Sequence, residues 1–205
     1  MQAAIERPPA QFNFAEYLLA LNEARAAKTA YIDDQRSLTY GELVQRACRF
    51  ASNLPALGLR REERVLLMMQ DCADWPVAFL GCLHAGVVPV AVNTLLPASD
   101  YAWMLGHSGA RAVITSGNLV ATVQAAFDQL GSQLPIIVSA EPEAVLPTGT
   151  SAFSALADTG SDAGKPAATS RDDIAFWLYS SGSTGTPKAT VHSHGNLFMT
   201  AATYG

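Results

Sequence analysis

Strand-like and helix-like segments alternate through the middle of this chain, and that alternation is the feature that most restricts its fold. The expected order is a strand at 65–69, a helix at 73–85, a strand at 87–92, a helix at 99–108, a strand at 112–115, a helix at 119–130 and a strand at 135–139. Strands that alternate with helices through short connections form a mostly parallel sheet with helices on both faces. The predicted fold class is therefore α/β, and ligands are expected at the carboxyl ends of the strands.

Two helix-start signals precede this region. Asn13 and Thr39 are each followed three residues later by a glutamate, which resembles a capping box, so a helix is expected after each. Between them, residues 30–33 and 37–39 suggest a small hairpin. The second helix carries an apolar stripe that is typical of core packing, and Pro55 ends it.

A change of composition divides the chain. Residues 140–171 are rich in Ala, Gly, Pro, Ser and Thr, and only 153–157 resemble a short helix. We therefore expect a first α/β subdomain at 1–139, a link at 140–171 and the start of a second subdomain at 172–205. The last part should contain a strand ending at Tyr179, a strand at 189–192, and a helix that begins near residue 193 or 194 and runs toward Tyr204.

The segment Ser180–Lys188 (SSGSTGTPK) is the motif that says most about function. Gly182 and Gly185 have no Cβ, so the backbone there can turn and bring its N–H groups close to phosphate oxygens. The surrounding hydroxyls can donate to the same oxygens; they belong to Ser180, Ser181, Ser183, Thr184 and Thr186. Lys188 adds a positive charge just beyond Pro187. These residues predict a loop that binds a polyphosphate, with Thr184 as a possible ligand of a magnesium ion carried by it.

Two other interpretations of this loop are less favoured. The nucleotide-hydrolase loop has the spacing Gly-x-x-x-x-Gly-Lys and opens a helix, whereas here the spacing is Gly-x-x-Gly-x-Pro-Lys and a β-prone segment follows. A flexible Ser/Gly linker has a similar composition. However, apolar strand-like segments flank the loop at 174–179 and 189–192, and linkers seldom lie between buried strands.

The stretch from Ile174, IAFWLYSSGSTGTPKATVHSHGNL, resembles the phosphate-loop signature of the adenylate-forming acyl-CoA ligase superfamily and is most similar to benzoate-CoA ligases. Further matches lie upstream; they are FNFAEYLL from Phe12, TAYIDD from Thr29, LTYGEL from Leu38 and the stretch from Val77 to Val113. Together the matches cover nearly the whole chain. The resemblance implies part of the large N-terminal domain of such an enzyme. One departure is Ala189, where the family commonly has glycine; alanine should be tolerated there if the residue has strand dihedral angles.

The resemblance also implies a reaction. An aromatic carboxylate, benzoate or a close relative, would be transferred to the α-phosphorus of ATP to give an acyl-adenylate and pyrophosphate, and the thiol of coenzyme A would then displace AMP. ATP, Mg²⁺ and coenzyme A are therefore the expected co-substrates and cofactor. An acyl-CoA ligase for an aliphatic acid, and a non-catalytic phosphate- or nucleotide-binding module, are the alternatives.

Family members are more than twice as long as this chain, so we expect it to be an N-terminal fragment that forms no acyl-CoA by itself. The adenine-binding segment, an acidic magnesium ligand, the ribose-binding aspartate and the catalytic lysine would all follow Gly205. Lys188 is not that catalytic lysine. No catalytic residue is therefore assigned within the chain.

Four side chains after the loop have more than one interpretation. His192 and His194 form His-x-His, but no Cys, Asp or Glu lies close by to complete a metal site, so no direct metal ligand is expected. The resemblance implies instead that His194, alone or with His192, orders the loop and the start of the helix. Tyr204 lies on the helix that helps to wall the acyl pocket in the family, and it either stacks against an aryl acid or packs in the core; for Phe198 we favour packing.

Composition limits the partners. A chain of 205 residues with 49% hydrophobic residues can form one or two packed domains. Its net charge of −5 and its lack of a dense Lys/Arg run argue against nucleic acid or an anionic membrane as partner. The resemblance to acyl-CoA ligases implies a small carboxylic acid as the partner. Residues 1–9 contain no secretory signal, and Cys48, Cys72 and Cys82 are expected to be reduced thiols in core packing, as in a cytoplasmic protein. The oligomeric state is left open.

Overall fold

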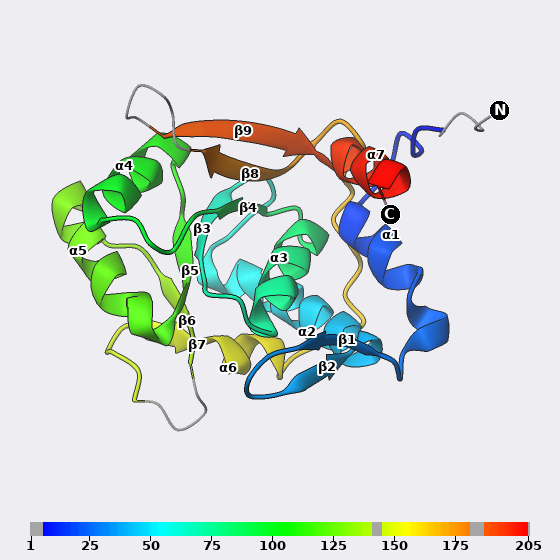
Figure 1. Ribbon diagram of the computed structural model, residues 1–205, viewed down its shortest axis with the longest axis horizontal. Coiled ribbons are helices and arrows are strands. Elements are labelled where there is room, and N and C mark those ends of the chain that lie inside the picture. The colour runs from blue at the N-terminus through cyan, green and yellow to red at the C-terminus, as the bar shows by residue number, and fades with distance from the viewer. Residues whose placement is uncertain (1–5, 141–144, 181–186, 205) are drawn as a thin grey trace.

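The computed structural model describes residues 6–140, 145–180 and 187–204 (Figure 1). Its strands are β1 (Thr29–Ile32), β2 (Ser37–Thr39), β3 (Arg64–Met68), β4 (Val88–Ala91), β5 (Ala112–Ser116), β6 (Ile136–Ser139), β7 (Thr150–Ala152), β8 (Ile174–Ser180) and β9 (Lys188–Ser193). Its α-helices are α1 (Phe14–Ala20), α2 (Tyr40–Asn53), α3 (Asp74–His84), α4 (Ala98–Ser108), α5 (Val120–Leu130), α6 (Phe153–Ala157) and α7 (His194–Tyr204). Short 3₁₀ turns occur at Glu23–Arg25, Leu54–Leu57 and Gly117–Leu119.

A central sheet organises the described part of the chain. Seven strands follow the order β7-β6-β5-β3-β4-β8-β9, and β1 and β2 form a separate antiparallel pair. Every neighbouring pair in the large sheet is parallel except β8 and β9. The predicted α/β class with a mostly parallel sheet is therefore confirmed.

Helices cover both faces of this sheet, and the strand residues alternate between the two layers. In β3, Val65 and Leu67 belong to one buried cluster, whereas Leu66 and Met68 belong to the other. The first cluster packs against α2 and α3, and the second against α4 and α5. Figure 1 shows these two helix pairs on either side of the strands. From Val65 to Met68 every residue of β3 is apolar and buried, as expected for a strand in a sheet covered on both faces.

The helix starts agree with the capping signals. The Asn13 side chain accepts hydrogen bonds from the N–H groups of Ala15 and Glu16 at the start of α1. Thr39 and Glu42 form a complete capping box at the start of α2. These bonds satisfy N–H groups that have no partner within the helix, which is why the signals could be recognised locally.

The link was predicted to contain only one short helix, and that part of the prediction is incomplete. The helix at 153–157 is present as α6, but residues 150–152 directly before it form β7, the outer strand next to β6. The sequence of β7 is Thr-Ser-Ala, and its residues are half-buried. It therefore lacks the apolar run or alternation that reveals a strand, and its pairing with β6 supplies the structure instead.

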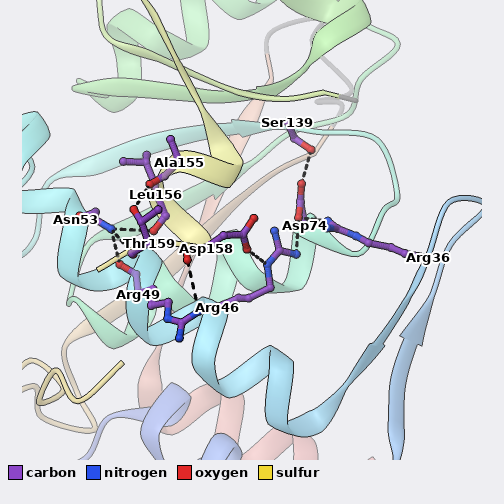
Figure 2. A network of polar contacts seen from close by, with 10 residues as sticks. All are labelled: Arg36, Arg46, Arg49, Asn53, Asp74, Ser139, Ala155, Leu156, Asp158 and Thr159. Atoms are coloured by element: carbon purple, nitrogen blue, oxygen red, sulfur yellow. Dashed lines mark hydrogen bonds and ion pairs between the residues drawn. The ribbon is translucent and has the colours of Figure 1, made fainter. Parts of the chain in front are cut away.

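A network of polar contacts, centred on the buried Arg46 and Asp74, attaches the link to the helices (Figure 2). The guanidinium of Arg46, on α2, lies 2.7 Å from a carboxylate oxygen of Asp158 and 2.9 Å from one of Asp74. Asp74 also pairs with Arg36 and accepts a hydrogen bond from the Ser139 hydroxyl at 2.8 Å. The link thus packs against the first part of the chain, while its interpretation as a boundary between subdomains stays a prediction.

Within the described ranges, none of the helices combines the length and the apolarity needed to cross a bilayer.

Candidate functional site

A cleft of about 510 Å³ lies at the carboxyl ends of three neighbouring parallel strands, β3, β4 and β8. Gln70 and Asp71 follow β3, Asn93 and Thr94 follow β4, and Tyr179 is at the end of β8. Carboxyl ends of adjacent parallel strands meet at one edge of a sheet, and this edge is where α/β folds bind ligands. The cleft is therefore the candidate site among the described residues.

The turns after the strands are held in place by hydrogen bonds. The Gln70 N–H donates to the Ser116 hydroxyl, at the end of β5, over 2.9 Å. The Asn93 side chain accepts from the N–H of Leu95 at 2.8 Å, and the buried Tyr101 hydroxyl donates to the Asn93 carbonyl at 2.6 Å. Asn93 can therefore face the cleft from a turn whose shape is set by its own side chain and by α4.

The structure brings together two of the predicted phosphate-binding residues. Ser180 and Lys188 are direct partners in the antiparallel pair of β8 and β9, and both side chains are exposed. Directly paired residues in an antiparallel ladder project from the same face. A hydroxyl and an ammonium group therefore lie on the same face at one end of this strand pair, one residue beyond Tyr179, which lines the cleft.

The remaining predicted phosphate-binding residues lie outside the described residues. They are Ser181, Gly182, Ser183, Thr184, Gly185 and Thr186. Their roles, and the suggested contact of Thr184 with magnesium, stay predictions. Ala189 is described: it lies in β9 opposite Tyr179, and it is not among the described non-glycine residues with positive φ. The expectation that alanine adopts ordinary strand geometry at this position is confirmed.

His194 lies at the opposite end of β9, and its side chain is buried against α1. Its Nδ1 accepts a hydrogen bond from the Phe14 N–H at 3.1 Å. Burial lowers the pKa of His194 to about 4; the charge of Asp173 opposes this shift and that of Arg61 adds to it. The imidazole is therefore neutral at pH 7 and carries its proton on Nε2. This contact joins α1 to α7, and a role of His194 in ordering the loop stays a prediction.

The aromatic residues of α7 have different surroundings. Phe198 packs against Phe12 and Tyr17, with ring centroids 5.7 Å and 5.3 Å apart, so the packing interpretation of Phe198 is confirmed. Tyr204 is 88% exposed at the end of α7. Its suggested place in an acyl pocket stays a prediction. His192 stacks on Phe176, with centroids 4.6 Å apart, on the same face as Lys188.

Residue-level reasoning from the sequence missed Gln70, Asp71 and Asn93. A signal for them exists, because all three lie within two residues of the end of a predicted parallel strand. What the sequence does not reveal is that β4 lies between β3 and β8, which brings these turns to the same cleft as Tyr179, the residue before Ser180. Within the described ranges, no three His, Cys, Asp or Glu side chains are grouped so that they could hold a metal ion.

Comparison with known proteins gives one family. The family model described as AMP-binding enzyme matches residues 20–205. The benzoate–CoA ligase of Thauera aromatica is 42% identical over 199 residues, which cover 96% of this chain. Among solved structures, a benzoate CoA ligase from Burkholderia xenovorans LB400 superposes with a TM-score of 0.83 at 56% identity over 94% of this chain. The anthranilate CoA ligase AuaEII, in complex with anthranoyl-AMP, superposes with a TM-score of 0.90 at 29% identity over 96% of this chain.

The chain spans only part of each of these proteins. It covers 37% of the Thauera ligase, 37% of the Burkholderia chain and 38% of the anthranilate ligase chain. The cleft and the β8–β9 end described above therefore correspond to a part of a larger relative in each case.

Proposed function

We propose that the protein containing this chain, which belongs to the AMP-binding enzyme family, uses ATP to activate an aromatic carboxylate and then transfers the acyl group to coenzyme A. Two similar proteins are named for benzoate and one for anthranilate, and all three are CoA ligases. Benzoate or a ring-substituted relative is the proposed substrate, with the cytoplasm, where ATP, coenzyme A and reduced thiols coexist, as the proposed site of action.

The observation that carries this proposal is the pairing of Ser180 with Lys188 at the carboxyl edge of the parallel sheet. In the first step the carboxylate attacks the α-phosphorus, the bond to the bridging oxygen breaks, and negative charge accumulates on the departing pyrophosphate. A fixed ammonium group and hydroxyl donors at that point lower the barrier, because they stabilise charge that is larger in the transition state than in the ground state. The Lys188 ammonium and the Ser180 hydroxyl are suited to this role.

Magnesium is proposed to arrive with the triphosphate. The described residues offer no group of three acidic, histidine or cysteine ligands, and Thr184, the residue suggested for magnesium, lies outside them. When bound, the ion would neutralise phosphate charge. The role proposed for this chain is to bind the phosphate oxygens that the magnesium ion does not contact.

The test is ATP–pyrophosphate exchange, measured with the intact protein against a panel of aryl and alkyl acids. We expect benzoate or a substituted benzoate to support the fastest exchange. Faster exchange with an alkyl acid would show that the substrate is an aliphatic acid, and the proposed ligase activity would stand. ATP binding without exchange for any acid would support the alternative of a non-catalytic nucleotide-binding module.

A further inference from the structure

A hydrogen bond connects α4 to the end of β8. Nδ1 of His107, in the last turn of α4, lies 2.7 Å from the hydroxyl oxygen of Tyr179. Trp103, one helical turn before His107, stacks on the imidazole with centroids 4.6 Å apart and an interplanar angle of 12°. The Trp103 ring also meets the Tyr179 ring edge-on at 5.9 Å. We call Trp103, His107 and Tyr179 the α4–β8 cluster.

This cluster lies at the surface. Trp103 is 37% exposed, and His107 is exposed as well. Tyr179 is half-buried, and burial raises its pKa to about 12. The phenol therefore stays protonated near neutral pH and can donate to the imidazole. The contacts of the cluster thus hold Tyr179 from the side of α4.

The position of Tyr179 in the sheet shows what the cluster can do. The described pairing of β4 with β8 consists of Val90 with Trp177 and Ala91 with Leu178. Tyr179 and Ser180 extend beyond it, and their backbone partners, Ala189 and Lys188, are both on β9. On the face of the sheet that α4 covers, the Tyr179 side chain contacts His107 and Trp103, and these contacts support the projecting end of β8.

We propose that His107 is a positioning residue: through Tyr179 it keeps Ser180 and Lys188 in the register from which they contact the triphosphate. The functional half of this inference rests on the proposed ligase activity. The structural half, that His107 restrains the end of β8, is independent of it. The two halves need separate measurements.

The first measurement is backbone hydrogen exchange at residues 178–180 in the intact protein. His107→Phe keeps a ring that can stack on Trp103 but removes the nitrogen, and Tyr179→Phe removes the hydroxyl. Each should accelerate exchange at these residues by roughly 3- to 10-fold, the effect expected when one ordinary hydrogen bond is lost. His107→Asn, whose carboxamide places a polar atom near the position of Nδ1, should restore most of the protection. Tyr31→Phe, on β1 far from β8 in Figure 1, is the matched control and should leave exchange there unchanged.

The second measurement is steady-state kinetics with the same variants. Loss of the nitrogen or of the hydroxyl should raise KM for ATP by roughly 3- to 10-fold, with KM for the acid and the thermal midpoint little changed. The double variant should be no worse than the more impaired single variant, because the two groups act as one unit.

Distinct results would overturn each half. If backbone hydrogen exchange at 178–180 in His107→Phe has the wild-type rate, His107 does not restrain β8. Unchanged KM for ATP, or strictly additive effects in the double variant, would show that the hydrogen bond does not position the phosphate-binding residues. If the wild-type protein catalyses no ATP–pyrophosphate exchange with any acid, the proposed function fails. Backbone hydrogen exchange at 178–180 still decides in that case whether His107 restrains β8.

Discussion

Lys188 begins β9, is exposed, and stands opposite Ser180. Lys188→Ala should slow ATP–pyrophosphate exchange on the order of 10²-fold, because one prepositioned charge would be lost where pyrophosphate charge develops. The effect should fall on the rate more than on stability, since an exposed side chain contributes little to folding.

Lys165, which is exposed in the link, supplies the control for this substitution. Lys165→Ala removes the same charge and should catalyse ATP–pyrophosphate exchange at the wild-type rate. If Lys188→Ala also retains full exchange activity, Lys188 has no part in the chemistry.

His194 gives the stability of the chain a pH dependence. Its pKa is lowered from 6.5 to about 4 in the folded state, chiefly by burial, so below pH 6.5 the unfolded state takes up a proton that the folded state does not. Unfolding free energy should therefore be at its full value above pH 6.5 and fall by about 3 kcal/mol as the pH drops to 4. Urea unfolding at a series of pH values measures this.

His194→Asn is the informative variant, because the Asn carboxamide can still accept the Phe14 N–H but does not titrate. We expect the unfolding free energy of His194→Asn to fall clearly less between pH 6.5 and 4 than that of the wild type. Burial also lowers the pKa of His84, so part of the slope should persist. An unchanged slope would mean that His194 is not the group responsible.

At the scale of elements, two glycines within helices differ in the space that an added Cβ would find. A Cβ added to Gly81, on α3, would lie 2.8 Å from a ring carbon of Phe50 and 2.9 Å from the Ala47 carbonyl oxygen, both on α2. Gly81→Ala should therefore destabilise the protein by about 1–3 kcal/mol through overpacking between these helices. Thermal or urea unfolding gives the value.

Gly106, on α4, is the matched case, since an added Cβ would meet only Leu130 Cδ1 at an ordinary 3.6 Å. Gly106→Ala should be neutral or stabilising by up to about 1 kcal/mol, because alanine loses less backbone entropy in a helix. Equal effects of the two substitutions would contradict close packing between α2 and α3.

At the scale of the whole molecule, Arg46 connects α2 both to the start of α3 and to the link (Figure 2). Its side chain is only 9% exposed. Arg46→Leu should destabilise the protein by about 3 kcal/mol, because it leaves Asp74 buried with one fewer cation. Proteolysis within 159–166 should also become faster, since the link loses its ion pair through Asp158.

Arg111→Leu is the comparison, because the Arg111 side chain is 65% exposed and its contact with Glu63 is 3.6 Å long. It should change stability by no more than about 0.5 kcal/mol. If Arg46→Leu is equally mild, the ion pairs of Arg46 do not hold the link.

The sequence by itself determined the local elements: helices after Asn13 and Thr39, and apolar strands that alternate with helices. Capping bonds and side-chain periodicity act over a few residues, so they can be recognised without the fold. Tertiary structure alone decided the order of the strands, which brings Gln70, Asn93 and Tyr179 to one cleft, and the contact of His194 with Phe14 across 180 positions. Such contacts depend on how buried surfaces stack between distant segments, and local patterns along the chain do not encode that stacking.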